Sequence, residues 1–114
     1  MPNIGPVVIA IGNKRKIRRQ IDGFCRTHGL PLPCYTFRPE AAQHQVENAQ
    51  RILDALKVSD IKKGDQAKWE AFLRNTVFRG ADILARATAA TSKDEAIKIG
   101  EGLGAKVLEV RRQS

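Results

Sequence analysis

The sequence predicts a single α/β domain over residues 1–114, built on a small three-stranded, mostly parallel sheet with helices on its faces. Three observations support this fold class. The apolar, β-branched run Val7–Ile11 is typical of a strand buried on both faces, as in parallel sheets. Strand-like and helix-like segments then alternate, which favours right-handed crossovers. Finally, a chain of 114 residues suits one domain.

The first strand leads into a helix. Gly12 and Asn13 mark the turn, and Asn13 is expected to cap a helix that extends from Lys14 to about His28. Gly29 is a suitable helix stop. One face of this helix is predicted to be buried because apolar residues recur at helical spacing, at Ile17, Ile21, Phe24 and Cys25.

A second strand and a second helix follow. Cys34–Phe37 is rich in residues that favour strands. The second helix is expected to begin at Arg38–Glu40, because proline is tolerated in a first helical turn and an acidic residue is favourable there. Its apolar stripe recurs at three- and four-residue intervals, at Val46, Ala49, Leu53 and Leu56.

Residues 65–90 are predicted to form an extra helical layer, which is appended to the sheet or pairs with a second copy of the protein. Asp65 is a candidate cap for this region. Gly80 leaves two alternatives open, a continuous kinked helix or two helices that meet near Asn75–Gly80. The apolar positions that define the region are Trp69, Phe72, Leu73, Val77, Ile83, Leu84 and Ala87.

The last helix and strand have clear local signals. Ser92 and Glu95 are spaced as a capping box, which predicts a helix start at this point. Gly104 ends the helix. Ala105–Val110 is the predicted third strand, and Arg111–Ser114 is a tail.

The net charge of +8 is concentrated at the two ends of the chain. Residues 1–38 carry seven Lys or Arg and one acid, whereas residues 39–105 carry ten of each sign. Residues 106–114 carry three cations and one acid. A basic surface that meets phosphates would produce this segregation, which solubility alone does not require.

The parallel sheet predicts where these cations lie. Ligands of open parallel sheets bind beyond the carboxyl ends of the strands, and a basic segment follows each predicted strand here. The free N–H groups at the start of the first helix also attract anions. The predicted phosphate-binding residues on this common rim are Asn13, Lys14, Arg15, Lys16, Arg18, Arg19, Arg38, Arg111 and Arg112.

These features predict a nucleic-acid-associated protein that contacts phosphates of DNA or RNA without base-specific readout. Two alternatives remain. One is a protein-interaction adaptor or dimerising accessory protein, in which residues 65–90 pair in a dimer or dock a partner and the basic face meets an acidic protein. The other is a small enzyme acting on a phosphorylated substrate. The turn at Gly12–Lys14 lacks the P-loop and dinucleotide-binding patterns, and no cofactor is expected.

All the cysteines and histidines fall within twenty residues, at Cys25, His28, Cys34 and His44. These are zinc-ligand types, but their spacing matches no zinc motif, so they are weak metal candidates and no metal is expected. Cys34 with a histidine could supply a thiol nucleophile and base, but no third group orients them, and no catalytic residue is predicted.

Aromatic and arginine residues interleave in the predicted helical layer. The set Trp69, Phe72 and Phe78 with Arg74 and Arg79 could stack on unpaired bases. Core packing explains the spacing more simply.

The expected location is the cytoplasm, with no membrane partner. The N-terminus lacks the pattern of a signal peptide, and no apolar run reaches the ~18 residues that a membrane span needs. Two cysteines without a secretory signal indicate reduced thiols.

Overall fold

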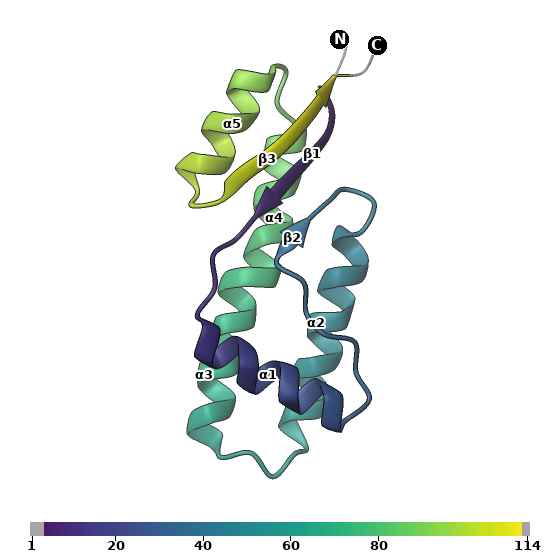
Figure 1. Cartoon of the computed structure of the whole chain (residues 1–114), viewed down its shortest axis with the longest axis vertical. Helices are drawn as coiled ribbons and strands as arrows, with labels where there is room; N and C mark the ends of the chain where they lie inside the picture. The colour runs from purple at the N-terminus through teal and green to yellow at the C-terminus, as the bar shows by residue number, and fades with distance from the viewer. Residues whose placement is uncertain (1–3, 113–114) are drawn as a thin grey trace.

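The protein is an elongated arrangement of helices with a small sheet at one end (Figure 1). The computed structural model describes residues 4–112, and its principal extents are 51 × 23 × 17 Å. No helix among the described residues is long and apolar enough to cross a bilayer. The elements in chain order are β1 (Ile4–Ala10), α1 (Arg15–Thr27), β2 (Thr36–Phe37), α2 (Ala42–Lys57), α3 (Lys63–Leu73), the π-helical turn η1 (Arg74–Phe78), α4 (Arg79–Thr88), α5 (Lys93–Gly102) and β3 (Lys106–Arg112).

The sheet is antiparallel, so the prediction of a mostly parallel sheet is wrong. Its strand order is β2-β1-β3, and β1 is antiparallel to both neighbours. A parallel crossover needs its helix to pack back onto the sheet. Instead, α1 leaves the end of β1 and packs on α3, away from the strands (Figure 1). The apolar run of β1 is explained by its central position, with α4 and α5 packed against the sheet.

Residues 63–88 form one continuous helical rod, which confirms the continuous alternative. The rod consists of α3, η1 and α4, and it runs along the long axis of the molecule (Figure 1). It is the central element rather than an appended layer, because α1, α2, α5 and β1 all pack against parts of it. Its apolar stripe is buried within the same chain, including Trp69, Leu73, Val77, Ile83 and Ala87.

Gly80 allows β2 to approach this rod closely. A Cβ atom placed on Gly80 would lie 2.4 Å from Cε2 of Phe37, a residue that is fully buried. Because Phe37 pairs with Ile9 in the sheet, this contact fixes the sheet against the start of α4. The glycine therefore marks a packing contact and not a break between helices.

The local end signals are partly confirmed. Gly29 follows α1 with φ of 66°, the left-handed conformation that glycine adopts without strain. The hydroxyl of Ser92 accepts a hydrogen bond of 3.1 Å from the backbone N–H of Glu95, as the capping box predicts. The predicted caps Asn13 and Asp65 are wrong, because the N-cap residues are Lys14 and Lys62.

Candidate nucleic-acid interface

Helix α1 is held against α3 by its apolar face and by one polar contact. Phe24 packs edge-on against Trp69, with ring centroids 5.9 Å apart. The indole Nε1 of Trp69 donates a hydrogen bond of 3.2 Å to the side-chain oxygen of Gln20. Ile21 and Cys25 are fully buried beside this contact. The opposite face of α1 is consequently directed to solvent.

That exposed face carries the α1 basic surface, which we define as Lys14, Arg15, Lys16, Arg18 and Arg19. All five side chains are exposed. Among the described residues, Asp22 is the one carboxylate paired with them, through a 3.9 Å contact with Arg18. The surface therefore presents several cations with no carboxylate partner.

The N-terminus of α1 is electrostatically unfavourable for the helix itself. Lys14 occupies the N-cap position, no side chain caps the first turn, and no acidic residue lies in that turn. Cations near a helix N-terminus oppose the helix dipole, typically by ~0.3–1 kcal/mol each. An anion bound there would remove this unfavourable term.

The predicted common rim does not form. Because β2 and β3 are antiparallel to β1, the chain leaves both strands in the direction away from Lys14. Arg38 follows Phe37, the partner of Ile9, and Arg111 lies near the far end of β1. Arg111 also donates a 2.6 Å hydrogen bond to Glu109, and this contact raises the pKa of Arg111. Arg112 lies at the same far end of β3, opposite Ile4. The predicted residues that stay together are those of the α1 basic surface and Asn13.

A groove of about 940 Å³ opens beside this surface, between the β1–α1 linker and the helical rod. Apolar side chains of Ile11, Ile17, Ala71 and Phe72 contribute to its lining. Its polar and backbone contributors are Gly12, Asn13, Lys14, Lys68, Asn75, Thr76, Arg79 and Gly104. We call this cavity the groove.

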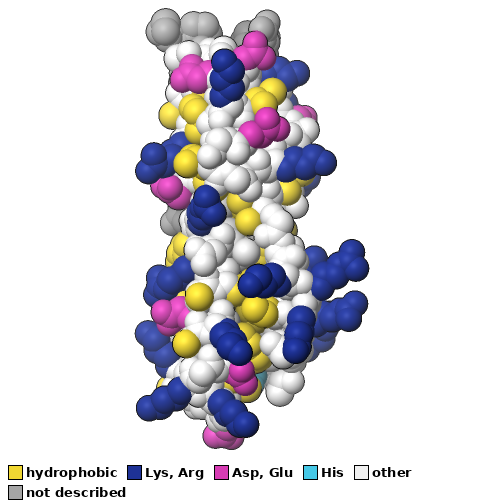
Figure 2. Space-filling view, turned by 90° about the vertical axis from the view of Figure 1, so that its left-hand side faces the viewer, with side chains coloured by type: hydrophobic (Ala, Val, Ile, Leu, Met, Phe, Trp, Pro, Cys, Tyr) yellow, Lys and Arg dark blue, Asp and Glu magenta, His cyan; other side chains and the backbone are white. Residues whose placement is uncertain are grey.

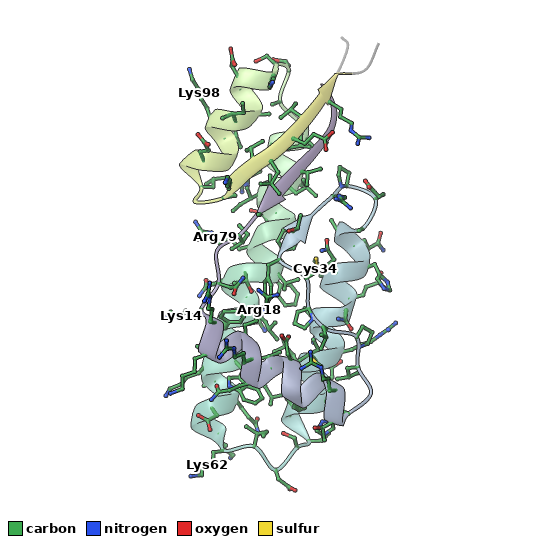
Figure 3. All side chains as sticks on the ribbon, viewed as in Figure 1. Lys14, Arg18, Cys34, Lys62, Arg79 and Lys98 are labelled. Carbon is green, nitrogen blue, oxygen red and sulfur yellow. The ribbon has the colours of Figure 1, made fainter. Side chains whose placement is uncertain are left out.

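Three cations from separate elements reach the groove. Lys14 comes from the linker, Lys68 from α3 and Arg79 from the start of α4. Figure 3 shows Lys14 and Arg79 along one side of the molecule, with Arg18 nearby. That side faces the viewer in Figure 2, where Lys and Arg side chains surround hydrophobic surface in the lower half and carboxylates are sparse. The groove therefore combines an apolar lining with a cationic border.

The π-helical turn lies in the wall of the groove. Asn75 and Thr76 belong to this turn, and both line the cavity. The hydroxyl of Thr76 donates a 2.7 Å hydrogen bond to the carbonyl oxygen of Phe72. Isolated π-helical turns within α-helices occur frequently at functional sites, which supports the groove as the candidate site.

No known protein family, curated protein or solved structure matches this chain.

Tyr35 links the α1 basic surface to the groove wall. The guanidinium carbon of Arg18 lies 5.3 Å from the centre of the Tyr35 ring, and the same ring packs edge-on against Phe72 at 5.7 Å. Burial raises the pKa of the Tyr35 hydroxyl, which has no hydrogen-bond partner among the described atoms. Arg18 is thus positioned by packing, whereas Arg15, Lys16 and Arg19 are free of such contacts within the described part of the chain.

The cysteines and histidines do not come together as a metal site. Cys25 is buried in the core, whereas Cys34 and His44 are exposed. His28 stacks on Phe24, and its Nδ1 atom lies 2.9 Å from the carbonyl oxygen of Phe24. In residues 4–112 as described, no three His, Cys, Asp or Glu side chains are placed to share a metal ion.

The aromatic set of the rod serves packing. Trp69 and Phe72 are buried, and Arg74 lies over the ring of Phe78 at 5.6 Å. The apolar stripe that suggested dimerisation through residues 65–90 is buried within this chain.

Sequence reasoning missed Lys68 and Asn75 and placed Arg79 only with the aromatic set. A usable signal was present, because Lys68, Ala71, Asn75 and Arg79 recur at three- and four-residue intervals and share one helix face.

Proposed function

We propose that the protein binds nucleic acid through its phosphates, without base-specific readout, and that the α1 basic surface is the principal contact. The observation that supports this is the charge imbalance of one exposed helix. Residues 13–28 carry six Lys or Arg and one acid. Flexible, exposed cations of this kind contact a phosphate backbone and release its counterions.

The rest of the described surface does not share this imbalance. Residues 82–112 carry six Lys or Arg and five Asp or Glu. Arg86 and Arg111 each contact a carboxylate, at 3.0 and 2.6 Å. A phosphate backbone would consequently be attracted to the α1 end of the molecule more strongly than to the α5 end.

Sequence-independent binding follows from the residue types. Base readout requires donors and acceptors held rigidly against base edges, often as bidentate pairs. Lys14, Arg15, Lys16 and Arg19 have exposed side chains and no described partner that would fix their orientation. We expect them to follow phosphates and to tolerate any sequence.

The test uses random-sequence oligonucleotides, both single-stranded and duplex, at several salt concentrations. The variant R15A/K16A/R19A removes three cations that make no described contact with the fold. For this variant, the slope of log binding constant against log salt concentration should become shallower by about 2–3. Each phosphate contact contributes ~0.7 to this slope on single strands and ~0.9 on duplex. The matched control K93A/K98A/R111A removes three exposed cations from α5 and the far end of β3, and it should leave the slope unchanged.

Three outcomes would contradict the proposal. Affinity that does not respond to salt is incompatible with phosphate contacts. Equal losses in both triple variants would show that only net charge matters. Binding of a mononucleotide as tight as that of the oligonucleotides would point instead to a small phosphorylated ligand.

A further inference from the structure

We propose that the groove holds an unpaired nucleotide, so that the protein prefers single strands over duplex. This inference rests on the nucleic-acid binding proposed above and adds the class of substrate. It uses the groove, whereas the phosphate contacts of the α1 basic surface apply to single and double strands alike.

The lining of the groove fits a base better than a phosphate. Ile11, Ile17 and Ala71 contribute apolar surface to a cavity of about 940 Å³, within the range of small-ligand pockets. A phosphate group is fully charged and gains nothing from apolar contacts. The flat faces of a base are largely apolar, and they pack favourably against apolar side chains.

The polar groups of the groove fit the edges and the backbone of such a nucleotide. Asn13 and Asn75 lie in the lining, and each amide can both donate and accept hydrogen bonds. Two such amides can pair with any base edge, which agrees with binding that does not depend on sequence. Lys14, Lys68 and Arg79 provide cations for the phosphates on either side of the base.

Arg79 is fixed in place at one end of the groove. Its Nη2 atom donates a hydrogen bond to the carbonyl oxygen of Leu103, next to Gly104. Gly104 has φ of 93°, a conformation that favours glycine, and it also lines the groove. A guanidinium group has five N–H donors, so Arg79 keeps others for a phosphate.

A duplex cannot use this cavity without disruption. Paired bases are stacked inside the double helix, and extruding one requires unpairing and unstacking. The bases of a single strand are already unpaired, so placing one in the groove does not require a base pair to be broken. Because Lys14 belongs to both the groove and the α1 basic surface, a strand seated in the groove can continue along α1 without leaving the cationic region.

The first experiment needs no variant. The affinity of the native protein is measured for a single strand, for the duplex of the same sequence, and for a strand of equal length in which several residues are abasic. The abasic strand keeps the phosphates and removes the bases. We expect the intact strand to bind about tenfold more tightly than either competitor, which corresponds to about 1.4 kcal/mol.

The second experiment fills the groove without changing the charge. The variant A71L/N75L enlarges two exposed lining positions of the rod, and the control Q43L/A85L enlarges two exposed helical positions outside the lining. We expect A71L/N75L to bind the intact strand about tenfold more weakly and the duplex unchanged. The control should match the native protein, and circular dichroism verifies that both variants fold.

The outcomes separate the two proposals. Equal affinity for intact strand, abasic strand and duplex would overturn the inference while leaving phosphate binding in place. Equal losses on strand and duplex in A71L/N75L would also overturn it, because the groove would then hold phosphate only. Absence of salt-dependent binding to every probe would overturn the proposed function itself.

Discussion

Replacing Gly80 by alanine should destabilise the protein, although alanine is the better helix former. The added Cβ atom would lie 2.4, 2.5 and 2.9 Å from three carbon atoms of the Phe37 ring. Carbon atoms pack best about 3.5–4.0 Å apart, so the ring would have to retreat by roughly 1 Å. Phe37 is fully buried and its strand is paired with β1, so it has little room to move.

The expected magnitude is the difference of two opposing terms. Overpacking a core costs about 1–3 kcal/mol, and three ring atoms within 3 Å place this site near the upper end. The gain in helix propensity from glycine to alanine is about 1 kcal/mol. The net loss in unfolding free energy is then about 2 kcal/mol, or a fall in Tm of roughly 8 °C for a chain of this size.

The assay is urea denaturation of the native protein, Gly80→Ala and the control Gly23→Ala. Gly23 lies inside α1 with nothing within 4 Å of its added Cβ, so alanine should stabilise the protein by up to about 1 kcal/mol there. Phe37→Leu replaces the ring with a smaller side chain, so Gly80→Ala should lose less unfolding free energy in this background. A double-mutant cycle should therefore give a favourable coupling energy between the two substitutions. If Gly80→Ala were as stable as the native protein, the close packing of β2 on α4 would be wrong.

Three further predictions follow from local contacts. Cys34 should react with a thiol reagent at pH 8 in the native protein, whereas Cys25 should react only in denaturant. Burial raises the pKa of Cys25 to about 11 and keeps its thiol protonated, so fast reaction of both cysteines would contradict this burial. Ser92→Ala should lower the unfolding free energy by ~1 kcal/mol in urea denaturation, since it removes the cap of α5, and an unchanged midpoint would contradict this. Oligonucleotide binding should slow amide hydrogen exchange in the first turns of α1 more than in α5, and uniform protection would argue against a contact at α1.

The helices could be predicted from the sequence because their signals are local. Ile21, Phe24 and Cys25 of α1 repeat at helical spacing, and Gly29 and Ser92 mark ends through their own backbone conformation or hydroxyl. The N-cap residue of a helix was harder to predict where two neighbouring residues could each occupy that position. Lys14 occupies the N-cap of α1 although Asn13 is the better capping residue.

The direction of the strands could not be predicted from the sequence. An apolar run such as Val7–Ile9 suits the centre of a parallel or an antiparallel sheet equally well. What decides between them is where the connecting helix packs, and this depends on contacts between distant residues. Trp69 hydrogen-bonds Gln20 and packs on Phe24, which draws α1 onto α3 and away from the strands.

The same contacts determine where the charge of the protein is concentrated. With the strands antiparallel, Arg38 and Arg111 are separated from Lys14. Five of the eight net positive charges then belong to residues 13–28, at α1. The first turn of this helix has neither a side-chain cap nor an acidic residue, so its own electrostatics oppose it. By contrast, α5 has Ser92 as its cap and two acids in its first turn. Because the packing of Phe24 and Gln20 on Trp69 holds α1 in place, its N-terminus can remain cationic and open, which is the condition a phosphate-binding surface requires.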